Sequence, residues 1–346
     1  MAIFLSESGL RQHFFPLTHT RHVADLRIGI YTIREKWEAI TGEAIGNAND
    51  SRQPGAVLVP ANVIPTKDNA AAILHVAKQR TPITEADSVK LIHYPWDIFL
   101  LNDWALRRDF ELITAGKTSQ PLPPGNFCHA PENIFLEEGA KVSNTFLNAS
   151  TGPIYIGRNA EIMDGVMIRG PFAAGEGAVV KMGAKIYGST TIGPYCVAGG
   201  EIKNAVLFGY SNKAHDGYLG DSVLGEWCNI GAGTSNSNLK NTGGVVRYST
   251  NNEGDSIAAG NKAGLIMGDY SRAAINTSFN TGTVVGVCCN IFGEAPGKFV
   301  NNFSWGGERY IFEKALADIS NWKKMKGQLL SANEIEILKE LYHQNP

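Results

Sequence analysis

Residues 156–198 read IGRNAEIMDGVMIRGPFAAGEGAVVKMGAKIYGSTTIGPYCVA and carry an aliphatic residue at every sixth position. These positions are Ile156, Ile162, Ile168, Ala174, Val180, Ile186, Ile192 and Ala198. A six-residue period with a small or β-branched key residue is typical of a parallel β-helix, in which three hexads close one triangular coil. The key side chains would point inward and stack on their copies in the neighbouring coils. The sequence therefore predicts a β-helix in the middle of the chain.

We expect this β-helix to span residues 132–305. The 38 glycines of the 346-residue chain concentrate there, and glycine suits corners because it adopts positive φ without strain. The period is lost at Asn204 and returns by Leu219, which predicts a loop that leaves the coil between them. The six-residue spacing resumes later and predicts further coils at Ile275, Thr281 and Val287.

Residues 1–125 have the pattern of an α/β domain. Short apolar runs predict strands at 56–59 and 89–93, and apolar residues at helical spacing predict helices over 28–40 and 103–113. The proline-, glycine- and serine-rich stretch 116–124 (GKTSQPLPP) is typical of a linker.

Residues 306–346 predict a C-terminal helical cap. Two amphipathic patterns lie between residues 308 and 343, and Ser331 and Glu334 have the spacing of a capping box at a helix start. We expect these helices to cover the open end of the β-helix.

Composition excludes several classes of protein. A net charge of −2 disfavours a general nucleic-acid binder or a protein of anionic membrane surfaces. The N-terminus turns polar after five residues, so we expect neither a signal peptide nor a membrane span. The five cysteines form no CxxC pair, which predicts reduced thiols, a cytoplasmic protein and no metal site.

One segment carries a family resemblance. Residues 203–238 fit K-x(11)-H-x-x-Y-L-G-D-x(7)-N-I-G-A-G-T-x(3)-N without a gap. This pattern resembles the acetyltransferase half of the GlmU family, the bifunctional N-acetylglucosamine-1-phosphate uridylyltransferases/glucosamine-1-phosphate acetyltransferases. The resemblance extends loosely over residues 130–290 and more weakly over the N-terminal third. It implies a left-handed β-helix, a homotrimer and acetyl-CoA as the acyl donor.

The resemblance also implies roles for individual residues. His215 matches the general base that deprotonates the attacking amine, and an imidazole suits this task because it titrates near neutral pH. The other matches are Lys203 and Tyr218 for the sugar phosphate, Asn229 and Asn238 around the sugar and acyl centre, and Ala232, with Gly231 and Gly233, for the pantetheine arm of CoA. The alternative for His215 is a surface histidine without a catalytic task.

The chain departs from the family pattern where the family has an arginine for the sugar phosphate. The run Gly170–Ala173 (GPFA) is followed by AGEGAVVKM, which contains no arginine. Lys181 or Lys185 could substitute, but an ammonium is a point charge and lacks the bidentate fork of a guanidinium. The acceptor therefore stays open between an amino-sugar phosphate and a nucleotide-linked amino sugar.

Residues 8–29 resemble an eroded signature of sugar-1-phosphate nucleotidyltransferases. Arg11, Pro16, Leu17, Thr18 and Gly29 keep the order of that signature, but only Gly9 is left of its glycine-rich loop. The resemblance places a metal-binding aspartate where Asn62 stands, and an amide is a poor anchor for Mg²⁺. We expect a shortened, degenerate domain that needs Mg²⁺ only if it is active, with Arg11 and Arg21 as a candidate phosphate site.

Three interpretations of the whole protein remain open. The first is an acetyl-CoA-dependent transferase acting on an amino-sugar phosphate or a nucleotide-linked amino sugar. The second is a sugar-1-phosphate nucleotidyltransferase, and the third is a non-catalytic trimer that binds a sugar nucleotide. A β-helix carbonic anhydrase needs three zinc-binding histidines, and the predicted coils contain only His215. In each case the expected partners are a small-molecule sugar phosphate or sugar nucleotide and further copies of the chain.

Overall fold

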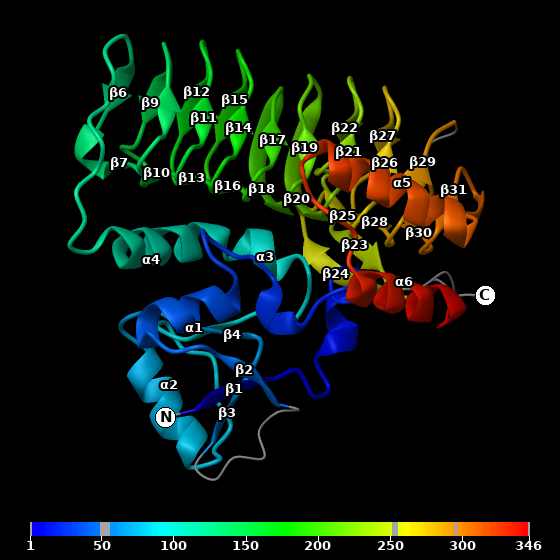
Figure 1. Ribbon diagram of the computed structural model, residues 1–346, viewed down its shortest axis with the longest axis horizontal. Helices are drawn as coiled ribbons and strands as arrows, with labels where there is room; N and C mark the ends of the chain where they lie inside the picture. Colours follow the sequence, from blue (N-terminus) through cyan, green and yellow to red (C-terminus); the bar gives the residue numbers. More distant parts are fainter. Residues whose placement is uncertain (1, 49–55, 251–254, 294–295, 345–346) are drawn as a thin grey trace.

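The computed structural model of the chain describes residues 2–48, 56–250, 255–293 and 296–344. A long β-helix forms the upper half of the molecule, an α/β region lies below it, and two C-terminal helices lie beside the last coils (Figure 1). This confirms the predicted fold class of an N-terminal α/β region, a left-handed parallel β-helix and C-terminal helices.

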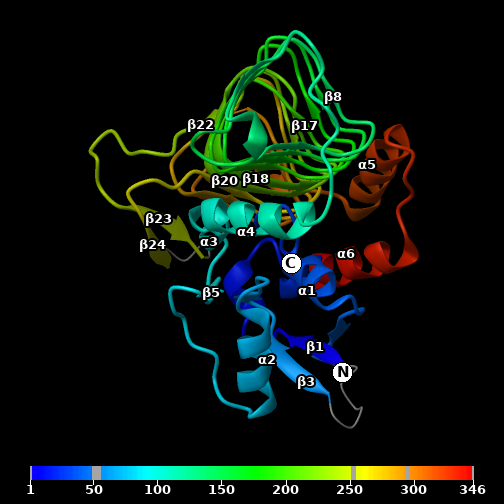
Figure 2. The ribbon, with the colours of Figure 1, turned by 90° about the vertical axis from the view of Figure 1, so that its left-hand side faces the viewer.

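The β-helix has three faces, which are visible end-on in Figure 2. Face A consists of β6 (Phe127–His129), β9 (Phe146–Asn148), β12 (Met167–Arg169), β15 (Lys185–Tyr187) and the first halves of β18 (Glu201–Gly209) and β20 (Tyr218–Glu226). In later coils, β22 (Ser235–Asn236) and β27 (Ser278–Phe279) pair with each other in a separate small sheet.

Face B consists of β8 (Lys141–Val142), β11 (Glu161–Ile162), β14 (Val179–Val180), β17 (Val197–Ala198), β19 (Asn212–Lys213), β21 (Asn229–Ile230), β26 (Arg272–Ala273), β29 (Asn290–Ile291) and β31 (Ser304–Trp305). Face C consists of β7 (Ile134–Leu136), β10 (Ile154–Ile156), β13 (Phe172–Ala174), β16 (Thr190–Ile192), the second halves of β18 and β20, β25 (Leu265–Met267), β28 (Thr283–Val285) and β30 (Phe299–Val300).

The predicted key residues form the interior of the coils. All eight, from Ile156 to Ala198, are at most 2% exposed and belong to one continuous hydrophobic cluster. In the later coils the six-residue period is present, but its phase differs from the prediction. The inward residues there are Met267, Ala273, Phe279, Val285 and Ile291.

The predicted phase for the later coils was therefore wrong. Ile275 lies in the corner between β26 and β27 and is 67% exposed. Val287 is buried, but outside the prism, against the C-terminal helices. An aliphatic residue at a corner can mimic an inward one in sequence because both recur with the period of the coil.

The loop predicted between Asn204 and Leu219 does not exist. β18 and β20 pair in parallel across this region, with Ile202 opposite Leu219 and Val206 opposite Val223. The six-residue period shifts because a corner is shortened. Only Gly199 and Gly200 connect β17 to β18, whereas residues 181–184 connect β14 to β15 in the preceding coil. A Cβ on Gly199 would lie 2.5 Å from a backbone oxygen of the next coil, so this tight corner requires glycine.

The segment that does leave the coil comes later. Val223 of β20 pairs with Ile266 of β25, and the residues between β22 and β25 form an antiparallel hairpin of β23 (Val246–Ser249) and β24 (Ser256–Gly260). The hairpin projects from the side of the solenoid toward the N-terminal region (Figure 2). Its Tyr248 is fully buried against that region.

The N-terminal region contains a small parallel sheet in the order β2 (Gly46–Asn47), β1 (Ile3–Ser6), β3 (Val57–Pro60), and a short antiparallel pair, β4 (Val63–Ile64) and β5 (Lys90–Leu91). Its helices are α1 (Ile33–Thr41), α2 (Ala70–Lys78), α3 (Asp97–Leu100) and α4 (Asn102–Thr114), with 3-10 turns at Arg11–Phe14 and Val23–Asp25.

The two helices predicted in this region correspond to α1, which begins later than expected, and α4. The helix expected over 28–40 starts at Ile33, because Thr32 and Glu35 form a capping box in which each side chain accepts the other residue's backbone N–H. The helix expected over 103–113 corresponds to α4. No described helix is long and apolar enough to cross a membrane.

The α/β region and the solenoid share one core. The outward residues of face C, among them Val206, Val223 and Ile266, belong to the same hydrophobic cluster as the core of residues 3–105. α3 and α4 lie directly on this face (Figures 1 and 2). The two expected domains therefore pack as a single body along the length of the β-helix.

An ion-pair cluster fixes the seam between them. The Arg21 guanidinium donates to the Asp269 carboxylate, lies 3.2 Å from a Glu226 oxygen, and sits 5.2 Å from the ring centroid of Phe208. Thr20 donates to the same Asp269 carboxylate. The Arg21 and Asp269 side chains are only 10% and 4% exposed, so the pair is shielded from water.

The C-terminal helices, α5 (Phe312–Met325) and α6 (Ala332–Gln344), run along the flank of the last coils. They bury their apolar faces against Trp227, Tyr270, Val287 and other residues at the corner between faces C and B. The last coil ends in a hairpin of β31 and β32 (Glu308–Arg309), so the helices do not cover the open end as expected. The capping box at α6 is confirmed, since Ser331 and Glu334 exchange side-chain to backbone hydrogen bonds.

The interior phase of the later coils can be tested by paired alanine substitutions. Phe279→Ala should lower the free energy of unfolding by about 3–5 kcal/mol, because it empties an inward site. Ile275→Ala, four residues earlier and largely exposed, should change it by less than about 0.5 kcal/mol. Urea unfolding measures both, and equal effects would contradict this assignment of the interior.

Arg21→Met should destabilise the protein by about 3–5 kcal/mol, because it leaves the buried Asp269 carboxylate without its partner. Arg11→Met is the matched control: that side chain is half exposed in its pair with Glu7, and its loss should cost less than about 1 kcal/mol. The comparison uses urea unfolding at neutral pH, and an Arg21→Met protein as stable as wild type would refute the seam role.

Candidate functional site

The motif residues 203–238 lie around the edge where face B turns into face A. His215 is exposed in the corner 214–217, which connects β19 to β20. One coil further on, the corner 231–234 stacks on it, and the Gly233 amide donates to the Asp216 carbonyl over 3.0 Å. His215 and the turn of Gly231, Ala232 and Gly233 are thus neighbours on the same edge.

Lys203 and Tyr218 lie on face A beside this edge. Their neighbours in the strands, Ile202 and Leu219, point into the prism, so Lys203 and Tyr218 point outward. The Asn238 amide donates to the Tyr218 hydroxyl over 3.0 Å, so these two side chains are in contact. Burial, followed by the nearby Asp221 carboxylate, raises the pKa of Tyr218 to about 12, so its phenol stays protonated at neutral pH.

Asn229 lies on the other side of the edge. It faces outward from face B, where its side-chain oxygen accepts a hydrogen bond from Asn212 over 3.4 Å, and it pairs in register with Arg272. Within one chain, therefore, Asn229 does not share a face with Lys203, Tyr218 and Asn238. A ligand that touches both groups has to cross the His215 edge.

Sequence reasoning did not single out Asp221. This buried residue ends the Tyr-Leu-Gly-Asp run, and its carboxylate accepts from the amides of Asn204, over 2.7 Å, and Asn238. It thereby fixes Asn238 next to Tyr218. Its position inside the motif could have marked Asp221 as a candidate site residue. Its hydrogen-bond partners could be identified only from the structure, because they come from neighbouring coils.

Face A also offers a candidate for the missing arginine. In β12, Arg169 follows Ile168, and Ile168 pairs with Ile186 of β15. Arg169 therefore lies beside Tyr187, the residue after Ile186. Tyr187 in turn pairs with Lys203 of β18, so the three side chains follow one another in one outward row of face A. Lys185 occupies the neighbouring outward row. None of the ion pairs among the described residues involves Arg169, Lys185 or Lys203.

Both N-terminal candidates bind other groups of the protein. Arg11 pairs with Glu7 at 2.9 Å and donates to the His19 carbonyl, whereas Arg21 is bound to Asp269 at the seam. The structure thus uses Arg21 to join the N-terminal region to the β-helix.

The position expected for a metal ligand in this region does not fit Mg²⁺. Asn62 is buried and donates its amide to the Ile92 carbonyl over 2.8 Å, so its side chain stabilises the local strands. The described residues contain no group of three histidine, cysteine or acidic side chains placed to hold a metal ion. Each of the five cysteines, all of them described, is a free thiol; four are buried and Cys128 is partly buried.

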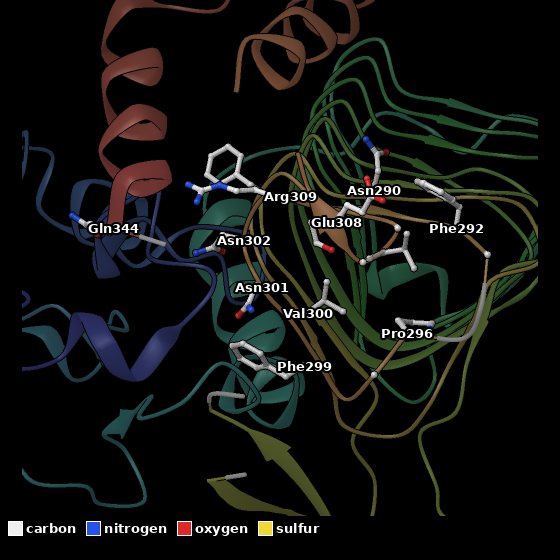
Figure 3. A pocket seen from close by; sticks show the side chains of 17 residues that line it. Asn290, Phe292, Pro296, Phe299, Val300, Asn301, Asn302, Glu308, Arg309 and Gln344 are labelled. Carbon is white, nitrogen blue, oxygen red and sulfur yellow. The ribbon is translucent and has the colours of Figure 1, made fainter. Parts of the chain in front are cut away.

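Two cavities lie away from the motif. One, of about 940 Å³, opens at the last coil between Asn290, Asn302 and Arg309 (Figure 3). The other, of about 250 Å³, lies between the first 3-10 turn, the Tyr94–Trp96 segment and the β23–β24 hairpin, where the Trp96 ring stacks on Tyr94 at 4.6 Å and on Tyr248 at 5.0 Å. Neither cavity is lined by any of the predicted site residues.

Comparisons with known proteins agree with both parts of the resemblance. A family model described as "Sugar nucleotidyl transferase" matches residues 3–81 and 51–118. A bifunctional sugar-1-phosphate nucleotidylyltransferase/acetyltransferase of Sulfurisphaera tokodaii is 31% identical over 236 residues, which is 64% of this chain and 50% of that protein.

Proteins named bifunctional protein GlmU are also similar. The protein of Methanococcus maripaludis is 25% identical over 73% of this chain and 56% of its own length, and that of Methanocaldococcus jannaschii is 34% identical over 26% and 21%. The chain thus spans between about a fifth and just over half of the length of these relatives. The chain is similar, at modest identity and over part of their length, to GlmU-type bifunctional sugar-1-phosphate nucleotidyltransferases/acetyltransferases.

Proposed function

We propose that the protein is an acetyl-CoA-dependent N-acetyltransferase that acts on an amino-sugar phosphate or a nucleotide-linked amino sugar, with His215 as general base. One observation carries this proposal: an exposed imidazole lies on a β-helix edge, between a glycine-rich turn and a face with phosphate-binding chemistry. The names of the relatives, which include acetyltransferase activity, support the same reaction class.

The chemistry requires a base because the acceptor amine is mostly protonated at neutral pH. In this proposal the His215 imidazole takes a proton from the ammonium, and the freed lone pair attacks the thioester carbonyl. The nitrogen of the tetrahedral intermediate then releases its second proton to solvent, and the C–S bond breaks. The imidazolium gives its proton to the leaving sulfur, so CoA leaves as the thiol. The small residues of the 231–233 turn allow the pantetheine arm to approach the backbone next to His215.

The acceptor phosphate would bind on face A. Arg169, Lys185 and Lys203 supply positive charge around Tyr187, and the protonated Tyr218 phenol supplies a hydrogen-bond donor. Asp221 keeps Asn238 in place for the sugar ring through the hydrogen bond described above. Arg169 thus offers the guanidinium that the segment after residue 173 lacks.

A homotrimer is part of the proposal. A single β-helix offers convex faces, so a neighbouring copy would supply the second wall of the site. Phe127 and Phe146 stack at 5.0 Å on face A and are 67% and 50% exposed, in the same outward row as Tyr218. This exposed apolar strip supports docking of a second copy along face A.

Nucleotidyl transfer is the second candidate, because the family model matches the N-terminal region. Its phosphate and metal positions argue against it: Arg21 is bound to Asp269, and Asn62 to a backbone carbonyl. Release of pyrophosphate from UTP or dTTP in the presence of a sugar 1-phosphate and Mg²⁺ would establish this activity. We expect none.

His215→Ala should reduce acetyl transfer about 10²–10⁴-fold, because the variant lacks the base. His129→Ala is a matched control, since His129 is an exposed histidine at the far end of face A, in the first coil. Release of CoA thiol is followed with glucosamine 1-phosphate and with nucleotide-linked amino sugars. The control variant should keep the wild-type rate.

An unchanged rate in His215→Ala would remove the histidine from the mechanism. If no amino sugar is acetylated by the wild-type protein, the non-catalytic interpretation holds, and a sugar nucleotide should then raise the melting temperature through binding to the native state.

Phe146→Glu should convert the trimer to monomers, because it places a charge in the apolar strip. Leu329→Glu, a change at a 77% exposed residue after α5, is the control and should leave the assembly intact. Sedimentation velocity gives the oligomeric state. A wild-type protein that sediments as a monomer, or a trimer unaffected by Phe146→Glu, would rule out this interface.

A further inference from the structure

A lysine occupies an aliphatic position in the interior column of face B. The parallel register aligns one inward residue from each strand, and these residues are Val142, Ile162, Val180, Ala198, Lys213, Ile230, Ala273 and Ile291. Lys213 is the only polar residue of this described column and is 1% exposed. A buried ammonium needs hydrogen-bond acceptors, so the acceptors that the Lys213 ammonium finds indicate the role of this residue.

Within the described part of the chain, the corner that carries His215 lacks a turn hydrogen bond that the corners 181–184 and 231–234 have; the corner 274–277 lacks this bond too. In the corners 181–184 and 231–234 the fourth residue donates its amide to the carbonyl of the first, over 3.2 Å in both. Among the described backbone contacts, no such bond closes the corner 214–217. Its fourth residue is Gly217, with φ of 121°, where the other two corners place Ala184 and Thr234, both buried.

Glycines in the preceding corner and in the His215 corner itself leave room inside the prism. The preceding corner contains only Gly199 and Gly200, and the His215 corner ends with Gly217, so neither contributes a side chain that could fill the interior. The Lys213 side chain extends into this space. Its ammonium donates to the His215 carbonyl, and to the Gly199 carbonyl over 3.4 Å.

We propose that Lys213 is a positioning residue: from inside the coil, its ammonium binds the His215 carbonyl and so restrains a corner that has no turn hydrogen bond of its own, which fixes where the imidazole is presented. The apolar stem packs in the aliphatic column, and only the charged end reaches the backbone of the corner. Burial lowers the pKa of Lys213 to about 8, while the nearby Asp216 carboxylate acts in the opposite direction. The hydrogen bond to the His215 carbonyl satisfies the buried ammonium, which explains why an apolar column tolerates this lysine.

Only the catalytic consequence of this inference rests on the proposed function. The mechanical part, that Lys213 restrains the backbone of residues 214–217, holds or fails without any substrate. The two can therefore be separated by experiment.

The test is Lys213→Met, which keeps an unbranched apolar stem and removes the donors. Ile230→Met is the matched control, because Ile230 is the inward residue of the same column one coil later and makes no side-chain hydrogen bond. Hydrogen–deuterium exchange, read by mass spectrometry on peptides that cover 214–217 and 231–234, reports on the two corners separately. Lys213→Ala, which copies Ala198 of the preceding coil, is the alternative if methionine does not fit.

Lys213→Met should speed exchange in the 214–217 peptide about ten- to a hundredfold, the effect expected for losing a hydrogen bond from a charged donor. Exchange at 231–234 and the melting temperature should stay near wild type, and the control should leave both corners unchanged. In acetyl transfer, kcat should fall while the KM for acetyl-CoA is kept.

Unchanged exchange at 214–217 would overturn the inference, and so would equally fast exchange in every coil, which would indicate a merely structural lysine. If the corner loosens in Lys213→Met but the wild-type protein transfers no acetyl group, the positioning of residues 214–217 stands and the proposed function fails. If the corner loosens and kcat is unchanged, the proposed link to the imidazole is refuted.

Discussion

Inward stacking of aliphatic side chains is the constraint on which the rest of the structure depends. In most coils each face buries one apolar residue, and these residues form a single cluster that runs through the β-helix. This packing fixes the distance between coils and the direction in which the alternate residues point. Lys203, Tyr218 and Arg169 share a face because their neighbours in the strands have to point inward.

The same constraint explains why the edge at His215 is unusual. Glycine allows a corner to be short or open because it has no Cβ, and three glycines lie in the two corners that precede β18 and β20. These glycines leave a gap in the interior and a corner without its turn hydrogen bond. Lys213 fills the gap and binds the His215 carbonyl, so an apparent defect of the hexad pattern coincides with the candidate catalytic edge.

Two positions singled out in the N-terminal region, Arg21 and Asn62, bind other groups of the protein. Arg21, in the eroded signature, forms a shielded ion pair with Asp269 of the β-helix, and Asn62 stabilises the strands around it. Face C is buried under this region, whereas the Phe127–Phe146 strip on face A stays exposed. The α/β region therefore covers one face of the solenoid and leaves the face beside His215 available.

The sequence by itself determined the β-helix, its inward residues from Ile156 to Ala198, the α/β start and the terminal helices, because these depend on local periodicity. It also identified the motif that contains His215, Tyr218 and Asn238. Only the tertiary structure decided the phase of the later coils, since the hairpin and the shortened corners change the register without leaving a periodic signal. It alone placed Arg21 at the seam, Asn229 on a second face and Lys213 beneath His215, because such contacts join residues that are distant in sequence or hidden behind a corner.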